Sequence, residues 1–175
     1  MILREKYLEQ IRPFYESNLV KIITGIRRSG KSVILNQIME EIRKKSDNII
    51  YLNFERTSDV LKASDSFKIV EYINNNKKTG KCYIFLDEIQ EIPNWQIAVK
   101  DLRLDDNSIF ITGSNSKLLS GEILTLLSGR FVSFRIRPFV YKEICEYLAF
   151  INKEPSVMDY LIFGGFPGRF SLEGI

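Results

Sequence analysis

The sequence predicts an α/β protein with three layers, in which helices cover the faces of a central parallel sheet and further helices follow it. Three observations carry this prediction. Short apolar runs alternate along the chain with segments of helical periodicity, as in strand–helix–strand units. The run at residues 82–86 is apolar throughout, which is typical of a strand buried on both faces of a parallel sheet. After residue 137 only helical patterns remain, at residues 139–150 and 157–163.

The individual elements follow in chain order. Residues 2–17 have the pattern of a short amphipathic helix, which Pro13 interrupts because proline lacks the backbone donor. Runs rich in β-branched and aromatic residues predict strands at residues 19–24, 48–54, 82–86, 108–112 and 131–136. Apolar residues at helical spacing predict helices at residues 31–45, 67–74, 95–104 and 116–127, before the two C-terminal ones.

Length and composition set limits on the function. The 175 residues suffice for one domain with a sizeable core, and the net charge of +3 is too small to indicate nucleic-acid binding by itself. The absence of histidine excludes His-based triads and most zinc sites, and Cys82 and Cys145 are expected to be free thiols. No apolar run reaches the length of a membrane span, and the N-terminus lacks a signal-peptide core, so we expect a cytoplasmic protein without a membrane partner.

Residues 25–32 read Gly-Ile-Arg-Arg-Ser-Gly-Lys-Ser, which matches the phosphate-binding loop (P-loop) pattern Gly-x4-Gly-Lys-Ser. The glycines allow backbone N–H groups to surround a phosphate chain, Lys31 offers its charge to the β- and γ-phosphates, and the Ser32 hydroxyl can reach Mg²⁺. A chance match in a Gly/Ser turn is the alternative, but a predicted strand before the motif and a predicted helix after it are the required context. The residues expected to contact the nucleotide are Gly25, Arg27, Arg28, Ser29, Gly30, Lys31, Ser32 and Val33.

The apolar strand at residues 82–86 leads directly into Asp87 and Glu88, the arrangement of a Walker B motif. A carboxylate at the carboxyl end of a strand can hold Mg²⁺ opposite the P-loop, and the next one can orient a water for attack on the γ-phosphate. We therefore assign Asp87 to the metal and Glu88 to the water. The alternative, an acidic pair that begins a surface loop, is less favoured after a P-loop and a buried strand.

A polar side chain at the end of the strand at residues 108–112 would lie beside the γ-phosphate. Ser114 is the favoured γ-phosphate sensor, with Asn115 and Thr112 as rivals. Serine and asparagine are also good N-caps, so capping of the following helix is an equal alternative for this segment.

Two further side chains are candidates for the same site. Arg130 follows Ser128 and Gly129 at a predicted helix end, where its guanidinium could stabilise charge on the transferring phosphoryl group or simply bind helix-end carbonyls. Asn53, near the end of a predicted strand, could hold Glu88 away from the water, although an asparagine there is more often a turn former.

The motif spacing favours ATP over GTP. A predicted strand, residues 48–54, lies between the two motifs, and one strand inserted between the motif strands together with a catalytic glutamate marks the ATPase branch of P-loop proteins. Asp87 is followed by Glu88 rather than by the x-x-Gly of GTPases, and a guanine-reading Asn-Lys-x-Asp motif is missing from the sequence.

Together these motifs resemble those of an AAA+-type ATPase. More narrowly, the chain resembles the prokaryotic predicted-ATPase family in which an AAA domain precedes an uncharacterised C-terminal domain. The segments that carry the resemblance are Thr24–Ser32, Phe85–Gln90, Ile92–Trp95, Thr112–Leu119, Leu127–Arg130, Arg137–Phe139 and Gly164–Pro167. The resemblance implies an AAA+ core, expected at residues 1–150, with Arg130 in the place of an arginine finger. It also implies that residues 151–175 begin a C-terminal helical region that is truncated here.

The resulting hypothesis is a protein that binds ATP with Mg²⁺ and hydrolyses it slowly to drive or gate a conformational change in an unknown partner. The main alternative is a nucleotide-dependent switch or a DNA-associated module with little turnover, and a small-molecule kinase is a third. A homo-oligomer is compatible with this interpretation because an arginine finger can act in trans. DNA binding stays open, since no helix-turn-helix signal supports it.

Overall fold

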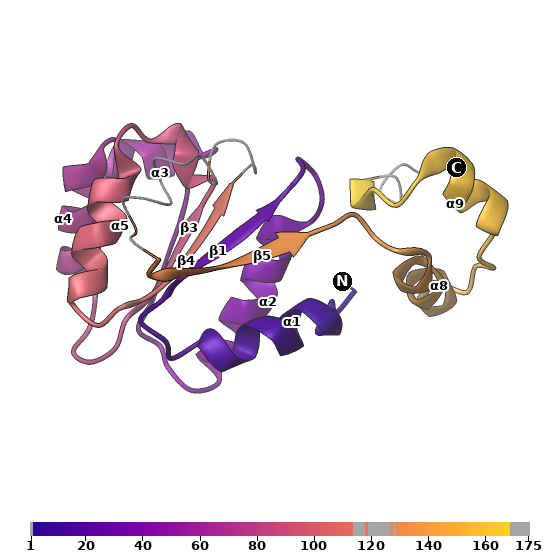
Figure 1. Ribbon diagram of the computed structural model, residues 1–175, viewed down its shortest axis with the longest axis horizontal. Coiled ribbons are helices and arrows are strands. Elements are labelled where there is room, and N and C mark those ends of the chain that lie inside the picture. Colours follow the sequence, from indigo (N-terminus) through magenta and orange to yellow (C-terminus); the bar gives the residue numbers. More distant parts are fainter. Residues whose placement is uncertain (1, 114–117, 119–126, 128, 169–175) are drawn as a thin grey trace.

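The centre of the protein is a five-stranded sheet in the computed structural model, which describes residues 2–113, 118, 127 and 129–168 (Figure 1). The strands are β1 (Val20–Gly25), β2 (Ile49–Asn53), β3 (Tyr83–Asp87), β4 (Ser108–Gly113) and β5 (Phe131–Ile136). Their order is β2-β3-β4-β1-β5, and each neighbouring pair is parallel. The predicted α/β class with a central parallel sheet is therefore confirmed.

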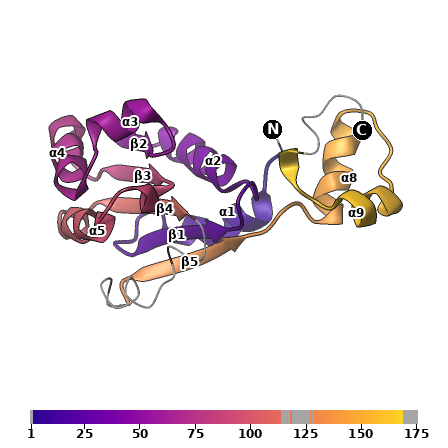
Figure 2. The same cartoon turned by 90° about the horizontal axis from the view of Figure 1, so that it is seen from above.

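The helices lie on both faces of the sheet and beyond one of its ends (Figures 1 and 2). Their bounds are α1 (Glu5–Ile11), α2 (Lys31–Arg43), α3 (Thr57–Lys62), α4 (Ser66–Asn76), α5 (Trp95–Leu104), α8 (Tyr141–Phe150) and α9 (Val157–Phe163), with single 3₁₀ turns η1 (Arg12–Phe14) and η2 (Ile89–Glu91). Pro13 lies within η1 at the end of α1, as its missing donor requires.

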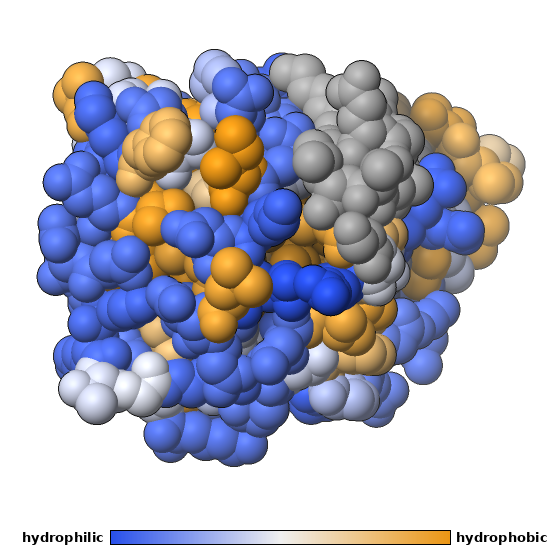
Figure 3. Space-filling model, turned by 60° about the vertical axis from the view of Figure 1, so that its left-hand side comes forward, coloured by the Kyte–Doolittle hydropathy of each residue, from blue (hydrophilic) through white to orange (hydrophobic). Residues whose placement is uncertain are grey.

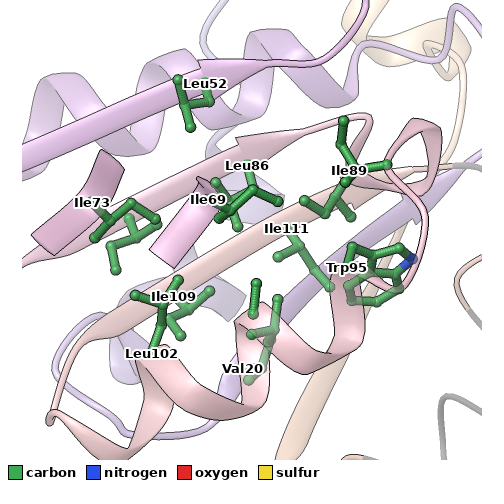
Figure 4. Packing of buried hydrophobic residues seen from close by; sticks show 14 of the residues in the cluster. Val20, Leu52, Ile69, Ile73, Leu86, Ile89, Trp95, Leu102, Ile109 and Ile111 are labelled. Atoms are coloured by element: carbon green, nitrogen blue, oxygen red, sulfur yellow. The ribbon is translucent and has the colours of Figure 1, made fainter. Parts of the chain in front are cut away.

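Two apolar layers join these helices to the sheet, because successive residues of a strand point to opposite faces. On one face, apolar residues of α1 and α2 pack against Ile23, Phe85 and Phe110. On the other, α4 and α5 pack against the alternate strand positions, which Figure 4 shows around Leu86 and Ile111. The same strands thus contribute side chains to both apolar layers, and the middle of the sheet is buried on both faces.

The structure differs from the sequence prediction in two places, and a third prediction is not tested by the described residues. The predicted strand at residues 48–54 is β2, which lies at the sheet edge, and β4 is the strand between β1 and β3. The short helix α3 was not predicted, because its sequence is mostly polar; Asp59 anchors it by accepting the Asn53 N–H at 3.0 Å. Most of the predicted helix at residues 116–127 lies outside the described residues.

The face over α4 and α5 carries exposed apolar side chains among polar ones (Figure 3). Phe67, Ile97 and Leu104 are each more than half exposed there. A groove of about 620 Å³ runs between the two helices. None of the described helices is both long and apolar enough to cross a membrane.

Helices α8 and α9 lie together beyond the end of β5 that carries Ile136, away from the faces of the sheet (Figure 1). The Phe139 N–H donates to the Gly165 carbonyl at 2.7 Å, and a Cβ at Gly165 would overlap the Phe139 carbonyl, so a glycine is needed at this contact. The rings of Tyr141 in α8 and Tyr160 in α9 pack against each other, with their centroids 5.6 Å apart. The division of the chain at residue 150 stays a prediction.

A buried lysine lies in the sheet at the end opposite to the P-loop. The Lys21 side chain is fully buried, and its Nζ donates to the Ser17 carbonyl at 2.8 Å and to the Ser108 hydroxyl at 2.9 Å. Burial, with a smaller contribution from Lys81, lowers the pKa of Lys21 to about 7. Since the unfolded chain keeps this proton to about pH 10.4, stability should rise with pH from about 7 upward.

We expect a Lys21→Met variant to lose this dependence. The free energy of unfolding of the unchanged protein, relative to that of the variant, should rise between pH 7 and 9 with a slope approaching about 1.4 kcal/mol per pH unit. Urea denaturation of both proteins at several pH values measures this difference, with Lys100→Met as the exposed-lysine control. Parallel curves for Lys21→Met and the unchanged protein would contradict a neutral Lys21 above pH 7.

Candidate nucleotide-binding site

The P-loop motif forms the connection between β1 and α2, so the predicted strand–loop–helix context is present. Gly25 has a φ of +156°, and a Cβ there would overlap the carbonyl oxygen of Ile136 in β5. Gly30 has a φ of +96° and is the N-cap of α2, a conformation that side chains disfavour. Both motif glycines are thus required by the backbone, which places the N-terminus of a 13-residue helix at the loop.

Two side chains of the loop are available to an anion. The Ser29 hydroxyl is buried and has no hydrogen-bond partner among the described residues. Lys31 is 5 % exposed, and its Nζ lies 3.5 Å from the Gly25 carbonyl and 3.2 Å from a carboxylate oxygen of Glu88. A phosphate fits this set, because it would satisfy the buried hydroxyl and bind the ammonium group at a helix N-terminus.

The carboxyl ends of three neighbouring strands meet around Asp87. This residue is fully buried, and its carboxylate accepts hydrogen bonds from Thr112 Oγ1, from Tyr51 Oη at 3.1 Å and from Asn53 Nδ2 at 3.4 Å. Burial and the Asp87 charge raise the pKa of Tyr51 to about 12, so the phenol remains a donor at neutral pH. Three donors therefore hold a carboxylate at the position predicted for the metal ligand.

The described residues show no group of three His, Cys, Asp or Glu side chains that could hold a metal ion. Asp87 and the Ser32 hydroxyl are hard oxygen donors of the kind that Mg²⁺ prefers, and Mg²⁺ characteristically completes its shell with water and phosphate oxygens. The chemistry of these donors therefore fits Mg²⁺ that arrives with a nucleotide, and it does not fit a metal held by the protein alone.

Glu88 has a left-handed backbone, with φ +53°, at the start of η2. One oxygen of its carboxylate lies 3.2 Å from Lys31 Nζ, and the other accepts a hydrogen bond from Gln90 Nε2 at 2.5 Å. The backbone N–H of Glu88 donates to Thr112 Oγ1 at 2.9 Å. The prediction that Asn53 holds Glu88 is wrong for this arrangement, because Asn53 donates to Asp87, and the side chain that donates to Glu88 is that of Gln90.

Two cavities meet at these residues. One of about 740 Å³ extends from Lys31 and Glu88 toward β2 and η2, and its lining includes Arg27, Lys31, Phe54, Glu55, Glu88, Gln90 and Glu91. The other, of about 500 Å³, extends along the loop, and its lining includes Arg27, Arg28, Gly30, Lys31, Ser32, Val33, Glu55, Glu88, Pro167 and Gly168. The space along the P-loop is therefore bounded partly by the segment that follows α9.

The remaining predicted residues have different outcomes. Ser114 and Asn115 lie outside the described residues, whereas Thr112 contacts both Walker B residues. Arg130 is exposed, and its carbonyl accepts the N–H of Val20 at 3.1 Å, at the beginning of β1. The P-loop follows the other end of β1, and the two ends of this strand are about 16 Å apart at the usual rise per residue. This geometry does not support contact between Arg130 and a phosphate bound by the same chain.

Sequence reasoning missed Arg4, which is 2 % exposed and contacts the P-loop. Its guanidinium donates to the Ser29 carbonyl at 3.0 Å, to the Arg137 carbonyl at 2.9 Å and to both carboxylate oxygens of Glu143 in α8 at 2.8 and 3.1 Å. The rings of Tyr7 and Phe139 lie 4.6 and 5.0 Å from it. An isolated arginine in an amphipathic segment gives no short motif that would have revealed this role.

The parallel sheet, the glycine loop before α2 and the acidic pair after β3 define the class of P-loop NTPases. The model of one family within this class, described as an AAA domain, matches residues 17–145, and the chain belongs to that family. The AAA+-type fold that the resemblance implied is therefore confirmed.

Two curated relatives match the chain with higher identity than the solved structures do. An uncharacterised protein of Haemophilus influenzae is 40 % identical over 177 residues, a match that covers 95 % of this chain and 44 % of the relative. The uncharacterised protein MJ1544 of Methanocaldococcus jannaschii is 38 % identical over 165 residues, covering 86 % and 36 %. The chain thus spans less than half the length of either relative.

Solved structures with low identity share the fold. The Walker-type ATPase PABY2304 of Pyrococcus abyssi superposes with a TM-score of 0.66 at 15 % identity, covering 96 % of this chain and 65 % of that one. AMPPCP-bound DnaA from Aquifex aeolicus superposes with a TM-score of 0.60 at 18 % identity, covering 98 % and 62 %. At these identities the likeness shows the fold alone.

We expect Arg4→Gln to destabilise the protein by about 3 kcal/mol, because the largely buried Glu143 carboxylate loses its positive partner and keeps only the Val140 N–H, and the Ser29 carbonyl loses its guanidinium donor. The control is Arg12→Gln, which breaks ion pairs with Glu5 and Glu41. Because the side chains of these two glutamates are a quarter or more exposed, this variant should lose less than about 1 kcal/mol of stability. Guanidinium denaturation of both variants gives the two values. Equal losses would show that the Arg4 contacts carry no special weight.

Proposed function

We propose that this chain binds ATP with Mg²⁺ at the P-loop and hydrolyses it slowly, and that the cycle drives or gates a conformational change in a partner. One observation carries the proposal: Lys31 of the P-loop and Glu88 after β3, which lie 57 positions apart in the sequence, are in contact at 3.2 Å. The phosphate-binding and water-orienting groups of an NTPase are therefore at one site. The family membership supports nucleotide binding and hydrolysis as its general chemistry.

The side chains have distinct tasks in this proposal. The loop amides and Lys31 bind the β- and γ-phosphates, and the Ser29 hydroxyl adds a donor. Ser32 and Asp87 hold Mg²⁺, which when bound neutralises phosphate charge. Glu88 orients a water in line with the γ-phosphate, and the hydroxyl of Ser114, the next residue in the sequence after Gly113, senses that phosphate.

The Lys31–Glu88 contact supports slow turnover. Both groups are largely buried, with side chains 5 % and 16 % exposed, so their attraction is weakly screened. Lys31 must exchange Glu88 for phosphate oxygens when a nucleotide binds, and Glu88 is then released toward the water. Binding and activation of the carboxylate are thus one exchange of partners at Lys31.

Arg130 has a proposed role only for a second copy of the chain. Its place at the opposite end of β1 separates it from its own P-loop, whereas its exposed position leaves it available to a neighbour. An arginine supplied in trans typically accelerates phosphoryl transfer by about 10³ to 10⁵-fold. The proposal therefore includes a homo-oligomer with shared sites, and the process that it serves is not identified.

DNA association has less support. A similar fold occurs in the Aeropyrum pernix ORC1 protein in complex with DNA, with a TM-score of 0.57 at 12 % identity. That identity shows the fold alone, and a net charge of +3 is too small to indicate a nucleic-acid-binding surface by itself. A nucleotide-dependent switch with little turnover is the second candidate, and the ion pair that occupies Glu88 favours it.

We expect Glu88→Gln to bind ATP several-fold more tightly and to hydrolyse it about 100-fold more slowly, because Lys31 loses a competing carboxylate and the water loses its base. Calorimetry with MgATP and single-turnover assays measure the two effects. Glu40→Gln, at an exposed position of α2, is the matched control and should change neither. Hydrolysis by Glu88→Gln at the rate of the unchanged protein would remove Glu88 from its role.

We expect the ATPase rate per chain to rise with protein concentration, because the proposed site is completed by a second copy of the chain.

Mixing inactive Arg130→Ala with inactive Lys31→Ala should restore part of the activity, because an intact P-loop of one variant can then meet an intact arginine of the other. Steady-state rates of the separate and mixed variants test this. A mixture no more active than its components, together with a rate per chain independent of concentration, would contradict a shared site.

A further inference from the structure

We propose that Gln90 is a positioning residue that fixes the carboxylate of Glu88 in its working orientation. This inference rests on the proposed function, since Glu88 is the residue through which Gln90 would act. Three features of the described residues carry it: the contact with Glu88, the rigidity of the arm that holds Gln90, and a buried polar atom of its amide that lacks a partner.

The contact is short and charge-assisted. Gln90 Nε2 donates to one oxygen of the Glu88 carboxylate at 2.5 Å, and the other oxygen faces Lys31. The two oxygens thus have separate partners. When phosphate takes Lys31, the hydrogen bond from Gln90 remains, and it leaves free the carboxylate oxygen that formerly faced the lysine. Gln90 therefore decides which oxygen is presented to a water.

The segment that carries Gln90, residues 88–92, is short and its backbone is held at both ends. Glu88 turns the backbone with φ +53°, and Gln90 lies in the 3₁₀ turn η2 that follows at once. Ile89 is fully buried and Ile92 is 3 % exposed, so both sides of the turn are anchored in the apolar layer under α5. The backbone of the turn is thereby fixed beside Glu88, and Gln90 Nε2, which also donates to Glu91 Oε1 at 3.3 Å, has Glu88 as its shorter partner.

The other end of the amide is placed against β4. A Cβ at Gly113 would overlap Gln90 Oε1, so the absence of a side chain at Gly113 makes room for this amide. Oε1 is buried and has no hydrogen-bond partner among the described residues. The orientation of the amide follows from its partners, because the reversed one would bring two acceptors together at the Glu88 carboxylate.

These contacts connect the end of β4 with the orientation of Glu88. Within the described part of the chain, the buried Oε1 has no donor, which costs free energy. A change in the position of Gly113 would therefore reach Glu88 through the Gln90 side chain. Gln90 touches neither phosphate nor water in this account and acts only through Glu88.

The test is Gln90→Met, which keeps the length of the side chain and removes the amide. We expect the single-turnover rate of hydrolysis to fall about 10- to 100-fold, the size of effect that misplacement of a reacting group produces. The Kd for MgATP should stay within about two-fold, since Gln90 does not contact phosphate. Gln96→Met, at a similarly half-buried position in the first turn of α5, is the matched control and should change neither value.

A double variant separates positioning from a general structural role. In a Glu88→Gln background, Gln90→Met should change the residual rate by less than about two-fold, because the carboxylate through which it acts is gone. A drop of the same size in both backgrounds, or a loss of ATP affinity that accounts for the whole effect, would overturn the proposal.

A second measurement does not need turnover. The shifts in the urea midpoint caused by Gln90→Met and Glu88→Gln should be non-additive in the double variant, because the two side chains share one hydrogen bond. Additive shifts would overturn the Gln90 proposal even in an active protein. An unchanged chain that fails to bind or hydrolyse MgATP would instead overturn the proposed function, while the midpoints still decide whether Gln90 holds Glu88.

Discussion

The site depends on the parallel pairing of β1, β4 and β3. Because parallel strands end at the same edge of a sheet, this pairing brings the P-loop after Gly25, the hydroxyl of Thr112 and the carboxylates of Asp87 and Glu88 to one place. The register is fixed by apolar layers on both faces, since a shift of one residue would turn buried isoleucines and phenylalanines to the wrong side. The polar site is thus aligned by the packing of an apolar sheet.

At this edge the two Walker B carboxylates have different surroundings. Asp87 is fully buried and accepts hydrogen bonds from three side-chain donors, which hold it in one place. Glu88 is held from two sides, by Gln90 and by Lys31, which is the proposed phosphate ligand. In the proposed cycle Asp87 keeps its partners, whereas Glu88, the next residue in the chain, exchanges one of them. The left-handed backbone of Glu88 allows the two adjacent carboxylates to have different surroundings.

Sequence reasoning predicted the fold class, all five strands of the described sheet and the motifs, because each leaves a local pattern: a glycine spacing, an apolar run or an acidic pair. It did not predict the contacts of Gln90, Tyr51 or Arg4, which join residues from separate elements. It predicted a contact between Asn53 and Glu88, whereas the register of β2 on β3 places Asn53 opposite Asp87, to which it donates. It also could not place Arg130, since its distance from the P-loop depends on the pairing of β5 with β1.

Arg4 has a mechanical consequence. One buried guanidinium is shared by the Ser29 carbonyl of the P-loop, the Arg137 carbonyl and the carboxylate of α8, and two aromatic rings enclose it. This junction resists separation, because withdrawal of α8 would remove both Glu143 hydrogen bonds from a charge that water cannot reach. A displacement of the C-terminal helices would therefore reach the phosphate-binding loop through Arg4 as well as reaching the sheet along the chain that joins α8 to β5.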